Sequence, residues 1–340
     1  MGADSPAPAD PALDRFLQRQ HLAEPSEHAA WTPLKGGVSS DIWRVDLPGR
    51  TICVKRALPK LRVGSDWYAP VSRNRYEWEW LLLAAKIAPR SVPRPLAHDA
   101  ELGLFAMEFL PQERYPLWKR QLLGGQVEVE TAAQVGRLLA SLHNATAGRP
   151  DIAAAFDCGD NFHALRLEPY LLATATRQAD LRATLEALVD RTARGRIALV
   201  HGDVSPKNIL VGPDAPVLLD AECAWYGDPA FDIAFCLNHL LLKSVFLPAH
   251  AARLLQAFDA MARSYFEDAR FEQRADLEAR AASLLPALTL ARIDGKSPVE
   301  YLVGRGAEQD LVRRLTRPLI MAPRGTMTSL AQHWRAGLSI

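Results

Sequence analysis

Three polar residues near the middle of the chain have the types and the spacing that phosphate chemistry requires. Asp203 and Asn208 stand five positions apart, and Asp220 follows two short apolar runs. An aspartate beside a hydroxyl group orients it and accepts its proton, while carboxylate and amide oxygens are the ligands that Mg²⁺ prefers. An ordinary Asx-rich turn would explain one such residue better than three at this spacing.

The segments around these residues resemble a known family. Residues 201–208 read His-Gly-Asp-Val-Ser-Pro-Lys-Asn, Asp220-Ala-Glu222 follows, and residues 227–233 read Gly-Asp-Pro-Ala-Phe-Asp-Ile. Over residues 30–300 the chain resembles the aminoglycoside phosphotransferase and choline kinase superfamily, which has a protein-kinase-like fold. The Asp-x-Glu form is closer to its choline and methylthioribose kinase branches. The resemblance implies an ATP-dependent kinase that phosphorylates a hydroxyl of a small molecule.

The resemblance also implies roles for individual residues. It makes Asp203 the catalytic base, makes Asn208 and Asp220 the Mg²⁺ ligands, and has Asp232 support the catalytic loop. His201 more naturally anchors the loop through hydrogen bonds than shuttles protons. Glu222 completes the supporting motif.

A glycine-containing turn and a lysine in the N-terminal third suit the phosphates of ATP. Gly36, Gly37 and Ser39 lie between two expected strands, where main-chain N–H groups could cover phosphates, although a plain hairpin turn is an alternative. Lys55 ends an apolar strand, where an ammonium group needs an anionic partner.

A carboxylate for Lys55 is expected from the helix that follows. Glu77 is the first choice and Glu79 the second, and a solvated glutamate remains an alternative. Further on, the segment Met107-Glu108-Phe109-Leu110 resembles a kinase hinge, in which main-chain groups from Glu108 to Leu110 would bind adenine.

The acceptor is expected to be a small molecule. Only eleven residues separate Asp220 from Asp232, and they contain no Ala-Pro-Glu segment that would support a peptide substrate. From Pro111 onward the chain has 26 basic and 26 acidic residues, whereas a polycationic aminoglycoside would prefer an acidic site. A resistance kinase is therefore an alternative, not the first choice.

Two segments are candidates for the acceptor pocket. One contains Arg166, and the other places Arg292, Asp294 and Lys296 around a glycine, which suits a polyol or an anionic group. A charged surface loop between helices is an equally good interpretation of the second segment. The aromatic residues Trp118, Trp225 and Tyr226 are expected in the core more than in the pocket wall.

The elements that position these residues predict an α+β, two-lobed, protein-kinase-like fold. Residues 1–12 are expected as a flexible tail, 13–110 as a small antiparallel β-rich N-lobe and 111–340 as a larger, mainly helical C-lobe. In the N-lobe we expect strands within 31–57, at 92–96 and at 104–109, and a helix at 73–88. In the C-lobe we expect a helix capped by Thr131, one at 173–193, and strands at 197–200, 209–211 and 217–219.

The composition of the chain bears on the classes of partner that it could bind. Forty basic against 39 acidic residues, with no signal sequence, indicate neither nucleic acid nor membrane as a partner, and four scattered cysteines suggest reduced thiols in the cytoplasm. The oligomeric state stays open. A non-catalytic nucleotide-binding protein and a metal-dependent hydrolase using His201, Asp203 and Asp220 are rival hypotheses. The hydrolase leaves Lys55 unexplained.

Overall fold

The computed structural model describes residues 10–24, 26–34, 39–58 and 70–340 of the chain. The chain divides into two compact units, and the boundary falls between Pro111 and Gln112. Each unit has its own core.

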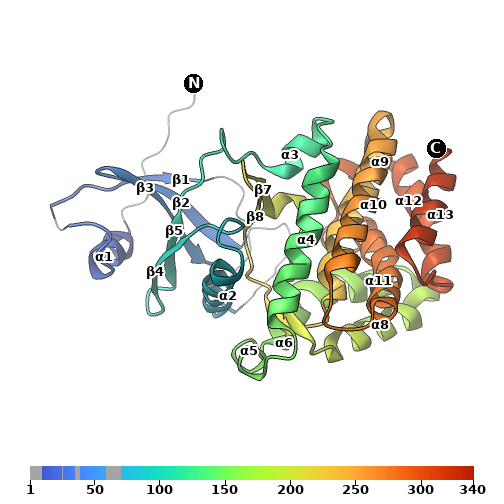
Figure 1. Cartoon of the computed structure of the whole chain (residues 1–340), viewed down its shortest axis with the longest axis horizontal. Coiled ribbons are helices and arrows are strands. Elements are labelled where there is room, and N and C mark those ends of the chain that lie inside the picture. Colours follow the sequence, from blue (N-terminus) through green and yellow to red (C-terminus); the bar gives the residue numbers. More distant parts are fainter. Residues whose placement is uncertain (1–9, 25, 35–38, 59–69) are drawn as a thin grey trace. The chain divides into compact units, whose positions relative to one another are not determined.

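The first unit contains a five-stranded antiparallel sheet in the order β1-β2-β3-β5-β4 (Figure 1). Its strands are β1 (Ala30–Pro33), β2 (Ser40–Leu47), β3 (Arg50–Ala57), β4 (Pro95–Asp99) and β5 (Leu104–Glu108). This confirms the predicted antiparallel N-terminal sheet. The strand expected at 92–96 begins only at Pro95, and a register irregularity follows between Pro95 and Ala97.

Two helices pack on this sheet, α1 (Pro11–Arg19) and α2 (Arg73–Ile87). Helix α1 begins where Asp10 accepts a hydrogen bond from the Ala12 N–H, and it buries Leu13, Phe16 and Leu17 against the sheet. Residues 11 and 12, which were expected in the flexible tail, are therefore helical. The residues before Asp10 lie outside the described ranges.

Alternation along β3 distributes its side chains over both faces of the sheet. Ile52 and Val54 join the apolar cluster that includes α1, whereas Cys53 and Lys55 point to the opposite face. Helix α2 supplies Glu77 to that face. The alternation thus brings a lysine and a glutamate together inside the unit.

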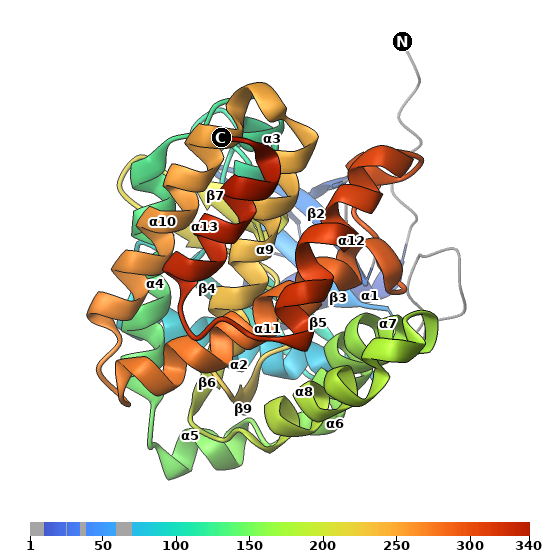
Figure 2. The ribbon, with the colours of Figure 1, turned by 90° about the vertical axis from the view of Figure 1, so that its right-hand side faces the viewer.

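The second unit is mainly helical (Figure 2). Its α-helices are α3 (Trp118–Leu123), α4 (Val129–Thr146), α5 (Pro150–Ala155), α6 (Gly159–Phe162), α7 (Ala173–Arg177), α8 (Arg182–Arg194), α9 (Ala230–Phe246), α10 (Ala251–Asp268), α11 (Arg274–Asp294), α12 (Gly306–Met321) and α13 (Met327–Leu338). Helix α9 is buried along almost its whole length and packs on α10 and α11. Gly136 lets α4 approach α10 closely, because a Cβ there would lie 2.4 Å from the Met261 carbonyl oxygen.

Two small antiparallel sheets complete the unit and flank the loop of residues 201–208. Strand β6 (Ala198–Val200) pairs with β9 (Trp225–Gly227), and β7 (Ile209–Val211) pairs with β8 (Pro216–Leu218). The strands predicted near 197–200, 209–211 and 217–219 correspond to β6, β7 and β8. Strand β9 was not predicted.

Two helix predictions in this unit are wrong in detail. Thr131 does not cap α4, because the helix begins at Val129 and Thr131 lies buried in its first turn. The helix expected at 173–193 is interrupted at Gln178, whose side chain bonds to Asp294 and Arg317 instead of continuing the helical surface. Within the described ranges, no single helix is both long and apolar enough to cross a membrane, and α9 with α10 meets that criterion only as a pair bent by 119°.

Candidate active site

The loop between β6 and β7 is held by Asp232, near the start of α9. The Asp232 carboxylate accepts hydrogen bonds from the main-chain N–H groups of His201 (2.7 Å) and Gly202 (2.8 Å). It also lies 3.2 Å from Nε2 of His143, whose Nδ1 lies 2.9 Å from the Tyr265 hydroxyl. These contacts fix the start of the loop, because charge-assisted bonds from two consecutive N–H groups leave the main chain little freedom.

Gly202 has a left-handed conformation with φ of 78°. A Cβ at this position would lie 2.5 Å from the carbonyl oxygen of Cys223. Both the conformation and the close approach therefore require glycine here.

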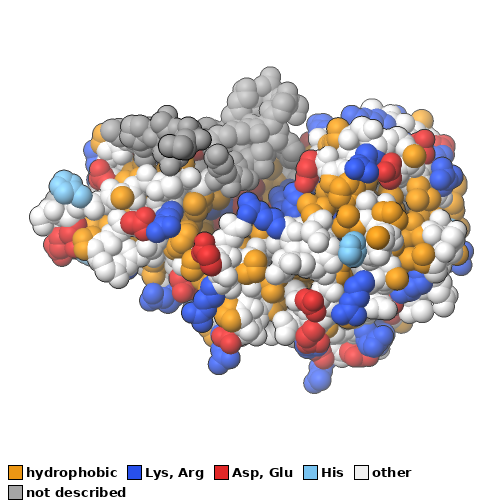
Figure 3. Space-filling model, turned by 90° about the horizontal axis from the view of Figure 1, so that it is seen from above, with side chains coloured by type: hydrophobic (Ala, Val, Ile, Leu, Met, Phe, Trp, Pro, Cys, Tyr) orange, Lys and Arg blue, Asp and Glu red, His pale blue; other side chains and the backbone are white. Residues whose placement is uncertain are grey.

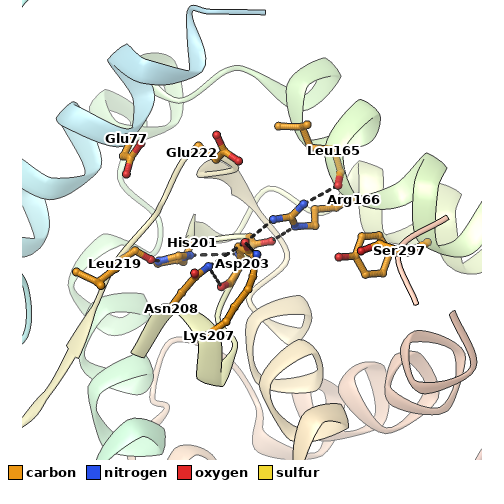
Figure 4. A network of polar contacts seen from close by, with 12 residues as sticks. Glu77, Leu165, Arg166, His201, Asp203, Lys207, Asn208, Leu219, Glu222 and Ser297 are labelled. Atoms are coloured by element: carbon orange, nitrogen blue, oxygen red, sulfur yellow. Dashed lines mark hydrogen bonds and ion pairs between the residues drawn. The ribbon is translucent and has the colours of Figure 1, made fainter. Parts of the chain in front are cut away.

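The His201 side chain is an internal anchor of the loop. Its Nε2 lies 3.1 Å from the Leu219 carbonyl oxygen, and its Nδ1 accepts the Asp203 N–H at 3.2 Å, which places the ring proton on Nε2 (Figure 4). Burial lowers the pKa of His201, so the ring is neutral around pH 7. A neutral ring with both nitrogens engaged is suited to positioning.

The Asp203 carboxylate has two differently placed oxygens, and its residue is only 1% exposed. Oδ2 lies 2.8 Å from Arg166 Nη2, 3.0 Å from Lys207 Nζ and 2.8 Å from Asn208 Nδ2 (Figure 4). Oδ1 is buried and has no hydrogen-bond partner among the described residues. Oδ2 is thus held in place, whereas Oδ1 can accept a hydrogen bond from a donor that is not part of the described protein.

Arg166 lies behind the loop, in a π-helical segment (His163–Leu172) that continues from α6. Its Nε donates to the Gly202 carbonyl (2.6 Å) and its Nη1 to the Leu165 carbonyl (2.6 Å). Although burial alone lowers it, the neighbouring Asp203 carboxylate keeps the pKa of Arg166 above its ordinary value. Arg166, predicted for the acceptor pocket, thus contacts Asp203 directly, and its part in binding an acceptor stays a prediction.

Asn208 and Asp220 offer oxygen atoms that fit Mg²⁺. The Asn208 amide nitrogen donates to Asp203, which leaves its Oδ1 as the side-chain atom for a cation. Asp220 follows β8 with φ of 67°, a conformation that costs a non-glycine residue roughly 1–3 kcal/mol and that accumulates at functional sites.

The donor set for a metal is small. In the described part of the chain, no group of three or more His, Cys, Asp and Glu side chains could hold a metal ion. One carboxylate and one amide oxygen suit Mg²⁺, which binds few protein ligands and completes its octahedron with water and phosphate oxygens. Glu222, two residues after Asp220, is buried, and its main-chain carbonyl accepts a hydrogen bond from the Asn161 side-chain amide at 3.0 Å.

In the first unit, Lys55 and Glu77 form a buried ion pair. Lys55 Nζ lies 2.6 Å from Glu77 Oε1, and the two residues are 2% and 5% exposed. Glu79, the second choice from sequence, is partly buried and pairs with the exposed Arg75 at 3.1 Å. The structure therefore brings Lys55 together with Glu77 and not with Glu79.

The remaining nucleotide candidates of this unit lie before β2 and at the end of β5. Gly36 and Gly37 lie outside the described residues. Ser39 is buried, and its carbonyl accepts the Leu58 N–H (2.9 Å) and Arg73 Nη2 (2.6 Å). Glu108 is the last residue of β5 and donates its N–H to the Arg94 carbonyl at 2.9 Å, and Leu110 follows two residues later.

The structure separates the acceptor candidates at the end of α11. Asp294 points to Arg313 (2.7 Å), and Lys296 pairs with Glu168 at the surface. Arg292 is buried and contacts the hydroxyls of Tyr170 (3.1 Å) and Ser297 (2.9 Å). Trp118, Trp225 and Tyr226 are buried in the core.

A model of one protein family matches residues 30–266, well over half of the chain. This model is that of the phosphotransferase enzyme family. The chain belongs to this family. The match begins at β1 and ends within α10, so it includes the Lys55–Glu77 pair and the loop of Asp203. The family resemblance inferred from sequence is confirmed.

Curated relatives of this phosphotransferase family member are methylthioribose kinases. The chain is 28% identical over 268 residues to methylthioribose kinase of Pectobacterium atrosepticum, which aligns 71% of this chain and 66% of the relative. It is 27% identical over 226 residues to methylthioribose kinase of Yersinia pseudotuberculosis, which aligns 59% of this chain and 55% of the relative. The chain thus spans between about half and two thirds of the length of the relatives it matches.

The fold has a solved counterpart. A choline/ethanolamine kinase family protein from Mesorhizobium loti matches with a TM-score of 0.51 and 16% identity, covering 97% of this chain and 99% of that one. At this identity the likeness concerns the fold alone, and it confirms the predicted kinase-like α+β architecture.

Sequence reasoning assigned no role to two residues that hold the loop. Lys207 stands four residues after Asp203 in a rigid loop, a spacing from which contact with the carboxylate could have been inferred. His143 lies in α4, 89 residues before Asp232, and nothing local in the sequence signals their contact.

Proposed function

We propose that this chain is an ATP-dependent kinase that transfers a phosphoryl group to a hydroxyl of a small molecule. The observation that carries the proposal is the Asp203 carboxylate, with Oδ2 fixed by three donors and Oδ1 buried without a partner in the described chain. A substrate hydroxyl would donate to Oδ1. Asp203 would align this hydroxyl and accept its proton as the oxygen attacks phosphorus.

The neighbours of Asp203 set its geometry for this step. Arg166 and Lys207 hold Oδ2 from two sides, so rotation of the carboxylate, which would exchange its oxygens, breaks charge-assisted bonds. Asp232 and His201 fix the main chain beneath it. Such preorganisation aligns the hydroxyl before reaction, which is the main protein contribution in phosphoryl transfer.

Mg²⁺ would be held by Asn208 and Asp220, together with phosphate oxygens and water. When bound, the ion neutralises charge on the phosphates. The two residues offer the oxygen ligands that this hard cation requires, and the strained main chain of Asp220 supports a functional assignment.

Residues 13–110 would bind the nucleotide, and residues 111–340 would supply the catalytic loop, metal and acceptor sites. Lys55, oriented by Glu77, would contact ATP phosphates. Gly36, Gly37 and Ser39 would cover the phosphates, and the main chain from Glu108 to Leu110 would bind adenine. The kinase names of the relatives support ATP as the donor.

The acceptor would be a small alcohol. The matched relatives carry names of methylthioribose kinases, and the sequence between Asp220 and Asp232 leaves no peptide platform. Four free, buried cysteines are consistent with a reducing cytoplasm as the location.

A metabolite panel tests the proposal. Purified chain is incubated with ATP, Mg²⁺ and each of a set of sugars, polyols, amino alcohols and hydroxy acids, and products are screened by mass spectrometry for the gain of one phosphate. Asp203→Asn is expected to lower kcat by about 10²–10⁴-fold while nucleotide affinity is retained. Asp157→Asn, which changes an exposed aspartate, is the matched control.

The outcomes separate the hypotheses. Nucleotide binding without transfer to any alcohol would support a non-catalytic nucleotide-binding protein. Unchanged transfer by Asp203→Asn would show that another group is the base. Transfer to aminoglycosides in preference to small metabolites would make the chain a resistance kinase.

A further inference from the structure

A buried arginine at the end of α11 lacks an acidic partner. Arg292 is 9% exposed, and its Nη1 contacts only the hydroxyls of Tyr170 and Ser297. Its Nε is buried without a hydrogen-bond partner, and no carboxylate within the described ranges lies within 4.0 Å of the guanidinium. A guanidinium in this setting is costly unless an anion accompanies it.

A buried lysine of α9 also has no acidic partner among the described residues. Lys243 is 1% exposed, and its Nζ lies 4.9 Å from the ring centroid of Tyr301. No hydrogen bond or ion pair of Lys243 is formed with the residues that the structure describes, and the Tyr301 hydroxyl is also buried without a partner. Burial, followed by the charge of Lys119, lowers the pKa of Lys243 to about 7. The site therefore disfavours positive charge as it stands.

The carboxylates in the neighbourhood are already occupied. Glu300 pairs with Lys119 at 2.5 Å, and Asp294 is held by Arg313 and Gln178. On the face shown in Figure 3, acidic and basic side chains are mixed over the helical unit at the right. Arg292 and Lys243 thus have no carboxylate partner among the described residues, although Glu300 and Asp294 lie in the same region.

This cationic interior adjoins the catalytic loop. The guanidinium carbons of Arg166 and Arg292 lie 5.8 and 5.4 Å from the same Tyr170 ring centroid, and Arg166 contacts Asp203 directly. Figure 4 shows Ser297, which Arg292 contacts, on the side of Asp203 opposite to His201.

Burial and the same positive charges lower the pKa of His239. His239 lies one helical turn before Lys243 on α9, and its pKa is lowered well below the ordinary value, first by burial and then by Lys243, Arg292, Lys207 and Lys119. The cations of the catalytic loop and of the α9–α11 region therefore act on one buried ring.

We propose that Arg292 and Lys243 bind an anionic group of the acceptor, so that the substrate is a small alcohol bearing a carboxylate or a phosphate. The inference rests on the proposed kinase function for the alcohol part alone. An anion would pair with both cations, and it would accept bonds from Arg292 Nε and the Tyr301 hydroxyl, two groups that have no hydrogen-bond partner among the described residues. A cationic or neutral alcohol would leave these groups unsatisfied, and a cationic one would be repelled.

Binding without ATP tests this independently of catalysis. Isothermal titration calorimetry compares charged alcohols with neutral counterparts of the same skeleton: gluconate with sorbitol, glycerate and glycerol 3-phosphate with glycerol, and ribose 5-phosphate with ribose. At least one charged member is expected to bind at least about 30-fold more tightly than its neutral counterpart. The carboxylate and phosphate members show which anion is preferred. Equal affinity within every pair, or no binding by any charged member, would overturn the proposal.

Two variants locate the anion. Arg292→Gln and Lys243→Met are each expected to weaken binding of the preferred anion at least about 30-fold and to leave its neutral counterpart unchanged. Lys243→Met should fold readily, since it removes a buried charge. Arg263→Gln, an equal change of charge at an exposed position of α10, is the control. Undiminished binding of the anion by both interior variants would refute the assignment.

The same preparations separate this inference from the kinase proposal. Selective anion binding that Arg292→Gln abolishes, without phosphate transfer to any alcohol, would support the anion site and count against the kinase function. Transfer to neutral alcohols at least as efficiently as to charged ones, with no loss in Arg292→Gln, would support the kinase function and overturn the anion site.

Discussion

Two lysines of this chain are almost equally buried but differ in their surroundings. Lys55 of β3 lies 2.6 Å from the carboxylate of Glu77, whereas Lys243 of α9 faces the ring of Tyr301 and has no acidic partner in the described part of the chain. A charge that is balanced within the fold remains charged without any ligand. A buried basic group without an acidic partner has a lowered pKa, or it binds an anion from solution.

The comparison teaches that burial alone does not identify the task of a basic residue. The Lys55–Glu77 pair holds the lysine in place, as the proposed contact with a nucleotide phosphate requires. The Lys243 site, together with Arg292, has the arrangement of an incomplete ion pair, in which the missing member would come from solution.

The largest expected effect concerns the balanced lysine. Lys55→Ala should lower kcat/KM for ATP by a factor that corresponds to about 2–5 kcal/mol, because it removes the proposed phosphate contact and the counter-charge of Glu77. Glu77→Ala should cost less, since Lys55 still reaches the phosphates. A double-mutant cycle on kcat/KM measures the coupling, which should exceed about 1 kcal/mol. Additive effects of the two changes would show that the pair does not act as a unit.

The unbalanced lysine should respond with the opposite sign in stability. Lys243→Met should raise the free energy of unfolding by about 2 kcal/mol near pH 6, because it replaces a buried ammonium without a carboxylate by an apolar chain of similar length. Lys55→Met should lower it, since Glu77 loses its counter-charge. Urea denaturation of both variants without ligands checks this. Destabilisation by both substitutions would remove the distinction between the two lysines.

The pH dependence of stability sharpens the same point. In the unfolded chain Lys243 keeps its proton up to its ordinary pKa, while the folded chain releases it near pH 7. The free energy of unfolding should therefore rise from about pH 7 to 9, by up to about 1.4 kcal/mol per pH unit from this group.

Subtracting the profile of Lys243→Met isolates this contribution. The charged and titratable groups that act with Lys243 are Lys119, Glu300, Arg292, Cys236 and His239, and they are common to both proteins. A difference between the two profiles that stays constant from pH 6 to 9 would show that Lys243 retains an ordinary pKa.

The smallest effect is expected from the neighbouring glutamate of α2. Glu79 is partly buried and pairs with the exposed Arg75, and ion pairs in contact with water contribute roughly 0–1 kcal/mol. Glu79→Ala should change the free energy of unfolding by less than about 0.5 kcal/mol and leave kcat/KM for ATP unaltered. Coupling between Lys55 and Glu79 in the same kinetic cycle would show that the wrong carboxylate was assigned.

The sequence predicted those features that depend on local pattern. The strands of the first sheet follow from alternation, and the loop of residues 201–208 between two short strands follows from the spacing of Asp203, Asn208 and Asp220. Helix α1 was missed because prolines and alanines dominate the first ten residues, although Leu13, Phe16 and Leu17 already have helical spacing.

Other features depend on contacts between distant residues. The interruption at Gln178 is produced by side chains more than 100 residues away, and no proline or glycine marks it. Arg166 has the same sequence signature whether it faces a substrate or Asp203. Only the packing of the π-helical segment behind Gly202 decides between the two.

Gly202 has a consequence for how this chain tolerates change. Every other residue type there would combine an unfavourable left-handed main chain with a collision against Cys223. A saturation-mutagenesis library selected for activity should therefore contain glycine alone at this position, although the residue has no side chain to offer a substrate. In such a selection Gly202 would look like a catalytic residue. Only its main-chain conformation and the close approach of Cys223 show that the constraint is steric.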